Sequence, residues 1–339
     1  MIYSNHIANT LKSLGADLGA PRQIAQAVLK LSDHYINHPD AATPWHTEWA
    51  KIAYVAYYFP LNYTRVAGVL RAGLGQNFWQ GLTSFSDFGS GLGTVPLAIA
   101  DMLPGQFERG LAVESSPATE NLYRQLALSH VAHPKLSWAT KLTPVPEASG
   151  HLTVFSFSLT ELPELPKAAL ASEALAIIEP ATNQDGRRLM QLRANLLANG
   201  WYAWAPCTHQ EACPLLVDSA RDWCHDRVTW EAPDWFLAIE EHLPIRNRTL
   251  THSYLLLRRQ PPPAAPYPTA RLTGDLQRQK GASKQMVCRG PKREFLSWQH
   301  KHGTPPAWPR GSLVRLAADI ETKSNELRPT PDQCELIGC

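Results

Sequence analysis

The spacing of apolar residues changes along the chain, and each spacing predicts a different kind of element. In the N-terminal part, apolar residues recur three or four positions apart, as in helices with one buried face. Two such runs are Ile24, Ala27, Val28, Leu31 and Ile52, Val55, Ala56, Leu61. Pro21 and Pro44 are suitable helix starts. We therefore expect a helical region over residues 1–80, with the aromatic run at 54–59 packed between helices rather than forming a base-stacking surface.

Strands and helices alternate after residue 81. The pattern predicts helices at 95–103 and 187–198, the second ending at Asn199-Gly200. Apolar runs predict strands at 82–88, 152–159, 174–180, 201–205 and 251–259. This alternation is typical of a doubly wound α/β sheet, and we place this domain at residues 81–260.

A glycine-rich turn joins the strand at 82–88 to its helix. Backbone N–H groups and a helix N-terminus at such a turn can face a polar or anionic ligand. Asp87 precedes the turn, and Glu114 ends the next apolar run, where a carboxylate can accept hydrogen bonds from ribose hydroxyls. The alternative is an ordinary tight turn of an α/β domain.

The run D-F-G-S-G-L-G-T resembles motif I of class I S-adenosylmethionine-dependent methyltransferases. This resemblance implies a Rossmann-like sheet of seven strands, with the seventh antiparallel between the fifth and sixth. It also implies S-adenosylmethionine as cofactor, bound by Asp87, Gly89, Gly91, Gly93 and Glu114.

The C-terminal part has a different pattern. A proline-rich run predicts a stiff linker at 261–268. Short strands between Gly and Pro turns are predicted at 270–276, 283–288, 294–298 and 312–316. They indicate a small OB-like β-domain at 269–318. Residues 319–339 lack periodicity, and we expect a mobile tail.

Charge is unevenly distributed. Residues 246–315 carry 14 Lys and Arg against 2 Asp and Glu, although the whole chain has a net charge of only +2. Such an excess favours a nucleic-acid-binding face over a solvated surface. No run is long and apolar enough for a membrane span, so we expect no membrane partner. The candidate RNA-binding residues are Arg278, Lys280, Lys284, Arg289, Lys292 and Arg293, with Phe295 and Trp298 interleaved for stacking.

Three of the six cysteines cluster in the predicted insertion 206–250, between the sixth and seventh strands: Cys207, Cys213 and Cys224. Cys288 follows in the basic β-domain. The first twenty residues have no signal-peptide or transit-peptide pattern, so we expect a cytoplasmic protein with reduced thiols. Four thiols can bind zinc or an iron–sulfur cluster. His209 and His225 keep a Cys3His zinc site open, and buried apolar cysteines are the remaining alternative. Cys334 and Cys339, in the predicted tail, are left out of the site.

The cysteine segment A-P-C-T-H-Q-E-A-C-P-L, followed by D-W-C-H, resembles the signature of the mitochondrial-ribosome small-subunit methyltransferase-like family, which has bacterial members. The family pattern is close to P-C-P-H-x-x-x-C-P followed by W-C-H-F. Thr208 and Asp226 depart from it. The resemblance extends to A-Y-Y-F-P-L-N-Y-T-R, I-I-E-P-A-T and K-G-A-S-K-Q-M-V-C, and so covers about residues 50–316.

This resemblance implies a 4Fe-4S cluster on Cys207, Cys213, Cys224 and Cys288, and binding to small-subunit ribosomal RNA of the 16S type during subunit assembly. DNA is not expected as a partner. A non-catalytic assembly factor on the same fold is one alternative. A zinc-containing methyltransferase of a small molecule or protein is the other.

The sequence assigns no catalytic residue. The region after the fourth strand reads S-F-S-L-T-E-L-P-E and lacks the N/D-P-P-Y/F motif of exocyclic-amine methylation. No cysteine precedes Cys207 to serve as the nucleophile of pyrimidine C5 methylation. Glu161 is available as a general base or as a solvated loop carboxylate.

Overall fold

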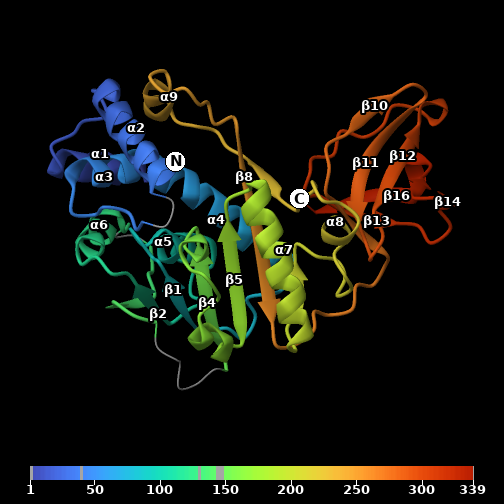
Figure 1. The fold of residues 1–339 in the computed structure, drawn as a ribbon, viewed down its shortest axis with the longest axis horizontal. Helices are drawn as coiled ribbons and strands as arrows, with labels where there is room; N and C mark the ends of the chain where they lie inside the picture. The colour runs from blue at the N-terminus through green and yellow to red at the C-terminus, as the bar shows by residue number, and fades with distance from the viewer. Residues whose placement is uncertain (1–2, 39–40, 129–130, 143–148, 339) are drawn as a thin grey trace. The chain divides into compact units, whose positions relative to one another are not determined.

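The computed structural model describes residues 3–38, 41–128, 131–142 and 149–338. The chain divides into two compact units. Figure 1 labels the helices and strands that form them. Unit 1 comprises Met1–Arg71, Trp79–Ile178 and Val228–Leu250, and unit 2 comprises Ala72–Phe78, Glu179–Arg227 and Thr251–Cys339. Each unit is thus built from separate stretches of chain.

Helices form the N-terminal part of unit 1, as the apolar spacing predicts. They are α1 (Ser4–Ser13), α2 (Pro21–Asn37), α3 (Glu48–Ala53), a π-helical turn (Tyr54–Tyr58) and α4 (Phe59–Leu74). Pro21 begins α2. An N–H at this position has no partner within the helix, so its absence in proline costs no hydrogen bond. Pro44 does not begin α3, because the Thr47 side chain accepts from the Ala50 N–H and caps the helix instead.

The first sheet has the strand order β3-β2-β1-β4-β5-β8-β6, and β7 also pairs with β8. Its strands are β1 (Ser84–Phe88), β2 (Arg109–Val113), β3 (Lys135–Ala139), β4 (His151–Ser156), β5 (Ala174–Glu179), β6 (Tyr202–Ala205), β7 (Asp226–Thr229) and β8 (Thr249–Arg258). The helices α5 (Thr94–Met102), α6 (Ala118–Leu126) and α7 (Asn183–Ala198) follow β1, β2 and β5. The pairs from β3 to β5 are parallel, while β8 is antiparallel to β6. This seven-strand order confirms the methyltransferase-like topology expected from the glycine motif.

Strand register brings the site residues of unit 1 to one edge of the sheet. Phe88, at the end of β1, is opposite Val113 of β2 and Phe155 of β4. The residues that follow these strands therefore lie together at the carboxyl ends, where ligands bind in open α/β sheets.

A second, largely antiparallel sheet forms the C-terminal part of unit 2, with the order β14-β15-β12-β11-β9-β13-β16 and β10 paired to β11. Its strands are β9 (Thr269–Leu272), β10 (Gln277–Gln279), β11 (Ala282–Cys288), β12 (Glu294–Gln299), β13 (Leu313–Leu316), β14 (Glu321–Lys323), β15 (Glu326–Arg328) and β16 (Cys334–Gly338). The exception to antiparallel pairing is β12 with β15. Two short helices, α8 (Pro214–Val217) and α9 (Asp234–Glu240), lie in the stretch between β6 and β8.

Two expectations for this sheet need correction. The order ends at β14 and β16, and no pairing among the described residues closes it into the OB-like barrel. Residues expected to form a mobile tail instead supply β14, β15 and β16. These strands are too short for a visible alternation, and β16 owes its place to pairing with β13. Cys339 lies outside the described residues.

Each unit has an apolar core of its own. In unit 1, the N-terminal helices pack with residues of α6 and α9. In unit 2, Val287, Leu296 and Val314 are among the residues buried beneath the second sheet. Within the described part of the chain, no helix combines the length and apolar character required to cross a bilayer.

Candidate cofactor, metal and nucleic-acid sites

The glycine loop of unit 1 is held in a shape that other residues cannot adopt without strain. Gly89, Gly91 and Gly93 have φ values of 68°, 51° and 74°. A Cβ on Gly89 would stand 2.4 Å from the Cβ of Ser158, and one on Gly93 would stand 2.5 Å from the Tyr123 ring. Gly89 and Gly93 are therefore required by the protein's own packing, independently of any ligand, whereas Gly91 is favoured by its positive φ.

Asp87 is the unsatisfied group at this site. It is the residue before the end of β1, with 1% of its surface exposed, and neither carboxyl oxygen has a hydrogen-bond partner among the described residues. Desolvation by burial raises the pKa of Asp87 to about 7; the nearby Ser90 side chain acts to lower this pKa, and Glu114 adds a smaller rise. A cation placed here would restore the ionised carboxylate.

Glu114 is fully engaged by the loop. Its Oε2 accepts the Gly91 N–H at 3.1 Å, and its Oε1 accepts from the Ser115 hydroxyl and the Ser116 N–H, each at 3.1 Å. The carboxylate thus fixes the loop's backbone, and a ribose hydroxyl would share these oxygens.

Two aromatic residues border the loop. A Cβ on Gly91 would stand 3.4 Å from the Trp45 ring and 3.7 Å from the Tyr54 hydroxyl. The two rings contact each other, with centroids 4.8 Å apart. The sequence does not predict Trp45 as a site residue, and it places Tyr54 in core packing. Nothing in the helical pattern shows that these residues approach a loop some 40 positions away.

The segment after β4 contains Glu161, a carboxyl with a shifted pKa. Phe157 has a left-handed φ of 58°, and the Arg65 guanidinium lies 5.7 Å from its ring centroid. Glu161 is exposed at the surface, but partial displacement of water by the protein, together with Glu114, raises its pKa to about 7. A carboxyl that titrates near neutral pH can accept or donate a proton there.

The four predicted cysteine ligands line one cavity within unit 2. Cys207 follows β6, Cys213 precedes α8, Cys224 precedes β7 and Cys288 ends β11. Residues of α7 also line the cavity, among them Met190 and Arg193. The fold thus brings together thiols separated by up to 81 positions in sequence. All four are free cysteines.

Hydrogen bonds to sulfur and to nearby carbonyls hold the first cysteine loop. Arg193, only 2% exposed, donates from Nε to Cys207 Sγ at 3.0 Å. Its other nitrogens donate to the carbonyls of His209 and Glu211 at 2.7 and 2.9 Å. His209 Nε2 lies 3.3 Å from Cys288 Sγ. Arg193 therefore fixes the loop and places a positive charge beside a candidate ligand.

The two departures from the family pattern have partners of their own. Thr208 donates its hydroxyl to the Cys288 carbonyl at 3.0 Å, which ties two cysteine segments together. Asp226 forms a buried ion pair with Arg271, whose guanidinium also lies 5.8 Å from the Tyr254 ring centroid. Both substitutions thus fit the local packing.

Burial favours the protonated thiol at Cys213, Cys224 and Cys288 in the absence of a metal. Desolvation raises the pKa of Cys213 and Cys224, and raises that of Cys288 to about 12, with a further contribution from Cys207 in each case. A metal centre would compensate the thiolate charges. Among the residues described, no three His, Cys, Asp or Glu side chains converge closely enough to hold a single metal ion.

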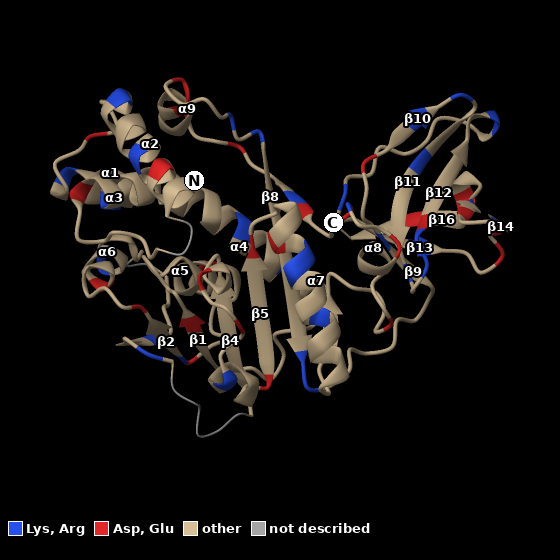
Figure 2. Ribbon diagram, in the orientation of Figure 1, with Lys and Arg blue, Asp and Glu red and all other residues tan. Residues whose placement is uncertain are grey.

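Acidic residues neutralise more of the positive charge of the basic segment than its sequence indicates. Lys284 pairs with Glu326, Arg289 with Glu294, and Arg293 with Asp222. Glu326 belongs to the region expected to be a separate tail. The exposed cations Arg278, Lys280 and Lys292 have no acidic partner among the described residues. Figure 2 shows Lys and Arg gathered around the β10–β11 hairpin.

Several solved structures that this chain resembles at low identity are described as methyltransferases. The putative RNA methyltransferase PH1948 from Pyrococcus horikoshii is 11% identical over 57% of this chain and 83% of that chain, with a TM-score of 0.35. A putative tRNA (m1A22) methyltransferase, Sp1610 from Streptococcus pneumoniae, in complex with S-adenosyl-L-methionine, is 12% identical over 58% and 75%, with a TM-score of 0.33. The plantazolicin methyltransferase BpumL is 15% identical over 75% and 99%, with a TM-score of 0.36. The fold rests on the strand order of the first sheet rather than on these distant likenesses.

A search of the curated proteins found no match for this chain. A family model described as "Mitochondrial small ribosomal subunit Rsm22" matches residues 48–296. The matched range contains the glycine loop, all four cavity cysteines and the β10–β11 hairpin. The chain therefore belongs to the Rsm22 family.

Proposed function

We propose that this protein binds S-adenosylmethionine at the glycine loop of unit 1, carries an iron–sulfur cluster in unit 2, and acts on small-subunit ribosomal RNA as an assembly factor. Asp87 carries the first part of the proposal. S-adenosylmethionine has an ammonium and a sulfonium group, and a buried carboxylate without a partner favours a cationic ligand. Asp87 would hold the cation, and Trp45 and Tyr54 border the same loop.

The donor set of the cysteine cavity supports the cluster. Four thiols from separate segments line the cavity, which is the ligand set of a 4Fe-4S cluster. A cluster distributes its four thiolates over separate iron atoms, so its cysteines stand further apart than the ligands of one zinc ion. The zinc alternative uses the same four thiols, and metal analysis decides between the two.

The cluster would supply redox or structural chemistry, and the chain's own residues would tune it. Arg193 would offset negative charge at Cys207, and Thr208 would hold the Cys288 segment against the first cysteine loop. The hairpin cations Arg278 and Lys280 would contact phosphates. The small ribosomal subunit named in the family's description is the proposed partner.

Methyl transfer to ribosomal RNA is a second candidate function. It is favoured by Glu161, whose pKa near 7 suits a general base beside the cofactor loop. Against it, unit 1 contains no cysteine, and the segment after β4 lacks the base-holding motif. We therefore favour an assembly factor that binds the cofactor.

Two measurements test the proposal. Protein purified without oxygen should be brown, absorb near 400 nm and contain about four irons per chain. A colourless protein with stoichiometric zinc would refute the cluster. Cross-linking in cells should recover small-subunit RNA, and a deletion strain should accumulate immature small subunits with unchanged RNA methylation. Loss of a single methyl group would establish the catalytic alternative.

A further inference from the structure

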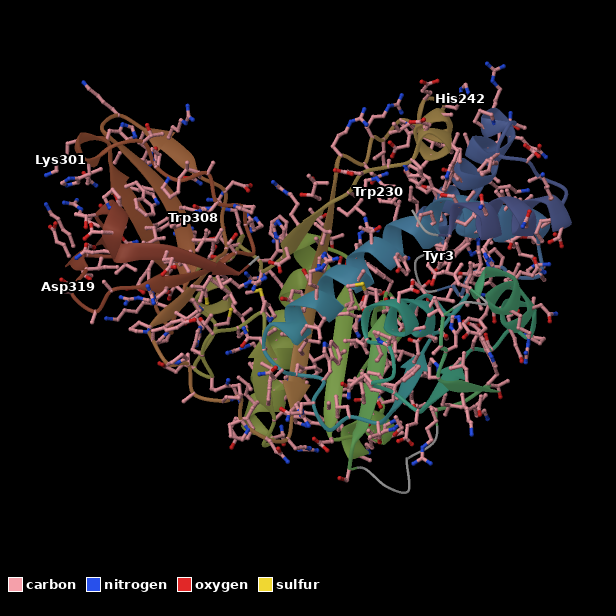
Figure 3. The ribbon with its side chains drawn as sticks, turned by 180° about the vertical axis from the view of Figure 1, so that it is seen from behind. Tyr3, Trp230, His242, Lys301, Trp308 and Asp319 are labelled. Atoms are coloured by element: carbon pink, nitrogen blue, oxygen red, sulfur yellow. The ribbon has the colours of Figure 1, made fainter. Side chains whose placement is uncertain are left out.

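One face of α7 contacts the cysteine loop, defined as residues 207–224, from its start to its end. Arg187, Met190 and Arg193 recur every three residues on this helix, so their side chains lie along one face. Figure 1 shows α7, in yellow-green, beside α8, the short helix of the loop. The side chains of both segments are drawn in Figure 3, with sulfur in yellow. Each of the three residues holds a different part of the loop.

Two of these residues hold the ends of the loop and also line the cysteine cavity. Arg193 holds the start, because it donates to Cys207 Sγ and to two loop carbonyls. Met190 holds the end, since its sulfur accepts the Cys224 N–H at 3.3 Å. Both side chains therefore belong to the site itself.

Arg187 holds the stretch between Cys213 and Cys224. Its Nη1 donates to the carbonyls of Ser219 and Asp222, each at 2.8 Å. These carbonyls follow α8, where the chain forms neither helix nor strand and its polar groups need other partners. Arg187 lies outside the described lining of the cavity. It therefore acts on the candidate ligands only through the backbone that carries them.

Trp223, which precedes Cys224, packs on the same helix. A Cβ on Gly186 would stand 2.5 Å from the Trp223 ring, so a larger residue there would displace the ring. The Trp223 indole N–H donates to the Ala181 carbonyl at 2.9 Å. Ser253, in β8, donates its hydroxyl to the Cys224 carbonyl at 2.8 Å. Contacts from two elements thus fix the last cysteine of the loop.

All of these contacts join protein groups to one another, and none of them includes a metal. Ordering an irregular loop is costly in backbone entropy. In zinc fingers the free energy of metal binding offsets that cost, and the metal-free chains are unfolded. Here the contacts with α7 offset the cost without a metal.

From these contacts we propose that α7 fixes the backbone of the cysteine loop before the metal arrives, and that Arg187 is the positioning residue on which this depends. The metal meets a preformed backbone, and only the thiol side chains adjust around it. This inference rests on the proposed metal site and holds for an iron–sulfur cluster and for zinc alike. A loop that folds only around its metal is the alternative.

Hydrogen exchange of the metal-free, full-length protein tests the state of the loop. The reporters are the amides of Val217, Asp218 and Asp222, which donate hydrogen bonds inside the loop. They should be protected in wild type, and adding metal should change their exchange little. In Arg187→Gln the protection should be lost, because the loop loses its bonds to a charged donor. Amides of β1 and β4, in unit 1, should stay protected and show that the variant folds.

Metal uptake tests whether the preformed backbone matters for binding. Metal-free protein is supplied with ferrous iron and sulfide without oxygen, and cluster formation is followed by absorption near 400 nm. Zinc affinity is measured separately by competition with a chromophoric chelator. Arg187→Gln should form the cluster more slowly and bind zinc about tenfold more weakly, since binding must now also order the loop. Metal should then restore protection to the loop amides of the variant.

Two further variants sharpen the test. Arg187→Lys should recover part of the metal affinity, because an ammonium keeps the charge but cannot reproduce the planar fork. Arg259→Gln is the matched control, since Arg259 donates to the Asn199 carbonyl at the other end of α7 at 3.1 Å. It should match wild type in both measurements. If Arg187→Gln and Arg259→Gln weaken binding equally, Arg187 has no special role and the inference fails.

The outcomes separate this inference from the proposed function. If the wild-type loop exchanges freely without metal and becomes protected when metal binds, the inference is overturned and the metal site stands. If Arg187→Gln loses protection but takes up metal like wild type, Arg187 has only a structural role and the inference is also overturned. Zinc binding without cluster formation, with the same dependence on Arg187, would support the inference and refute the cluster.

Discussion

The glycine loop of unit 1 and the cysteine cavity of unit 2 differ in whether their buried polar groups already have partners within the protein. At the glycine loop, Asp87 is buried without a partner, so the site depends on a cationic ligand for its ionised form. At the cavity, Arg193 and His209 already contact the sulfurs of Cys207 and Cys288. On the proposed function, the first site would take a ligand that exchanges, and the second would hold a group that remains bound.

The largest expected effect is the loss of iron in Cys224→Ser. This variant alters the cysteine cavity and leaves the glycine loop unchanged, so it tests the two sites separately. The variant should lose nearly all of its iron, because a cluster needs each thiolate ligand. Binding of S-adenosylmethionine should change by less than about twofold, since sites in separate units with no shared partners are nearly independent. Iron analysis and titration calorimetry measure the two effects. Cys334→Ala, at a buried cysteine outside the cavity, is the control and should keep its iron.

The next effect is at Asp87. Asp87→Asn should weaken S-adenosylmethionine binding about tenfold or more, since a hydrogen bond to a charged group contributes about 1.5–3 kcal/mol. It should leave iron content unchanged. An unchanged cofactor affinity would show that the carboxylate does not hold the cation.

Asp87 also predicts a pH dependence. Its folded-state pKa of about 7 lies above the unfolded value, so the folded state binds more protons between about pH 4 and 7. Its contribution to stability is therefore fully present at low pH and is lost as the pH rises through 7. Thermal melts should show that Asp87→Asn is less sensitive to pH and gains stability relative to wild type at pH 8. In addition, cofactor binding near pH 6.5 should release a proton, detectable by calorimetry in buffers of different ionisation enthalpy.

A smaller effect is expected from Arg193→Gln. The substitution leaves the carbonyls of His209 and Glu211 without their buried donor and should cost about 2 kcal/mol of unfolding free energy. Urea unfolding of the iron-free protein measures it, so the result does not depend on cluster occupancy. Arg193→Lys should recover only part of the loss, because an ammonium cannot reproduce the planar fork. Full recovery would mean that charge alone matters at this position.

The smallest effect concerns the basic hairpin. Arg278→Gln and Lys280→Gln should each lower the slope of log affinity for RNA against log salt by about 1, as expected for one lost phosphate contact. Arg293→Gln should lower the slope less, because Asp222 already pairs with Arg293. If the slope fell by the same amount in all three variants, the distinction between free and paired cations would be contradicted.

Local patterns in the sequence predicted the strand, glycine turn and helix of unit 1, because these three are contiguous. Their order also predicted the place of Asp87. The same sequence did not reveal Trp45, because a residue some 40 positions before the loop reaches it only through helix packing. The C-terminal strands were missed for a related reason. Three to five residues are too few to show alternation, and their partners are set by pairing across the sheet.

By itself, the sequence determined a methyltransferase-like topology, four candidate thiol ligands and an excess of positive charge. The tertiary structure decided which of these groups act together. It gathered cysteines from four segments around one cavity, left Asp87 without a partner, and paired half of the predicted RNA-binding cations with acids, among them Glu326 of the expected tail. Residue types and their spacing encode local geometry, whereas contacts between distant segments depend on how the whole chain packs.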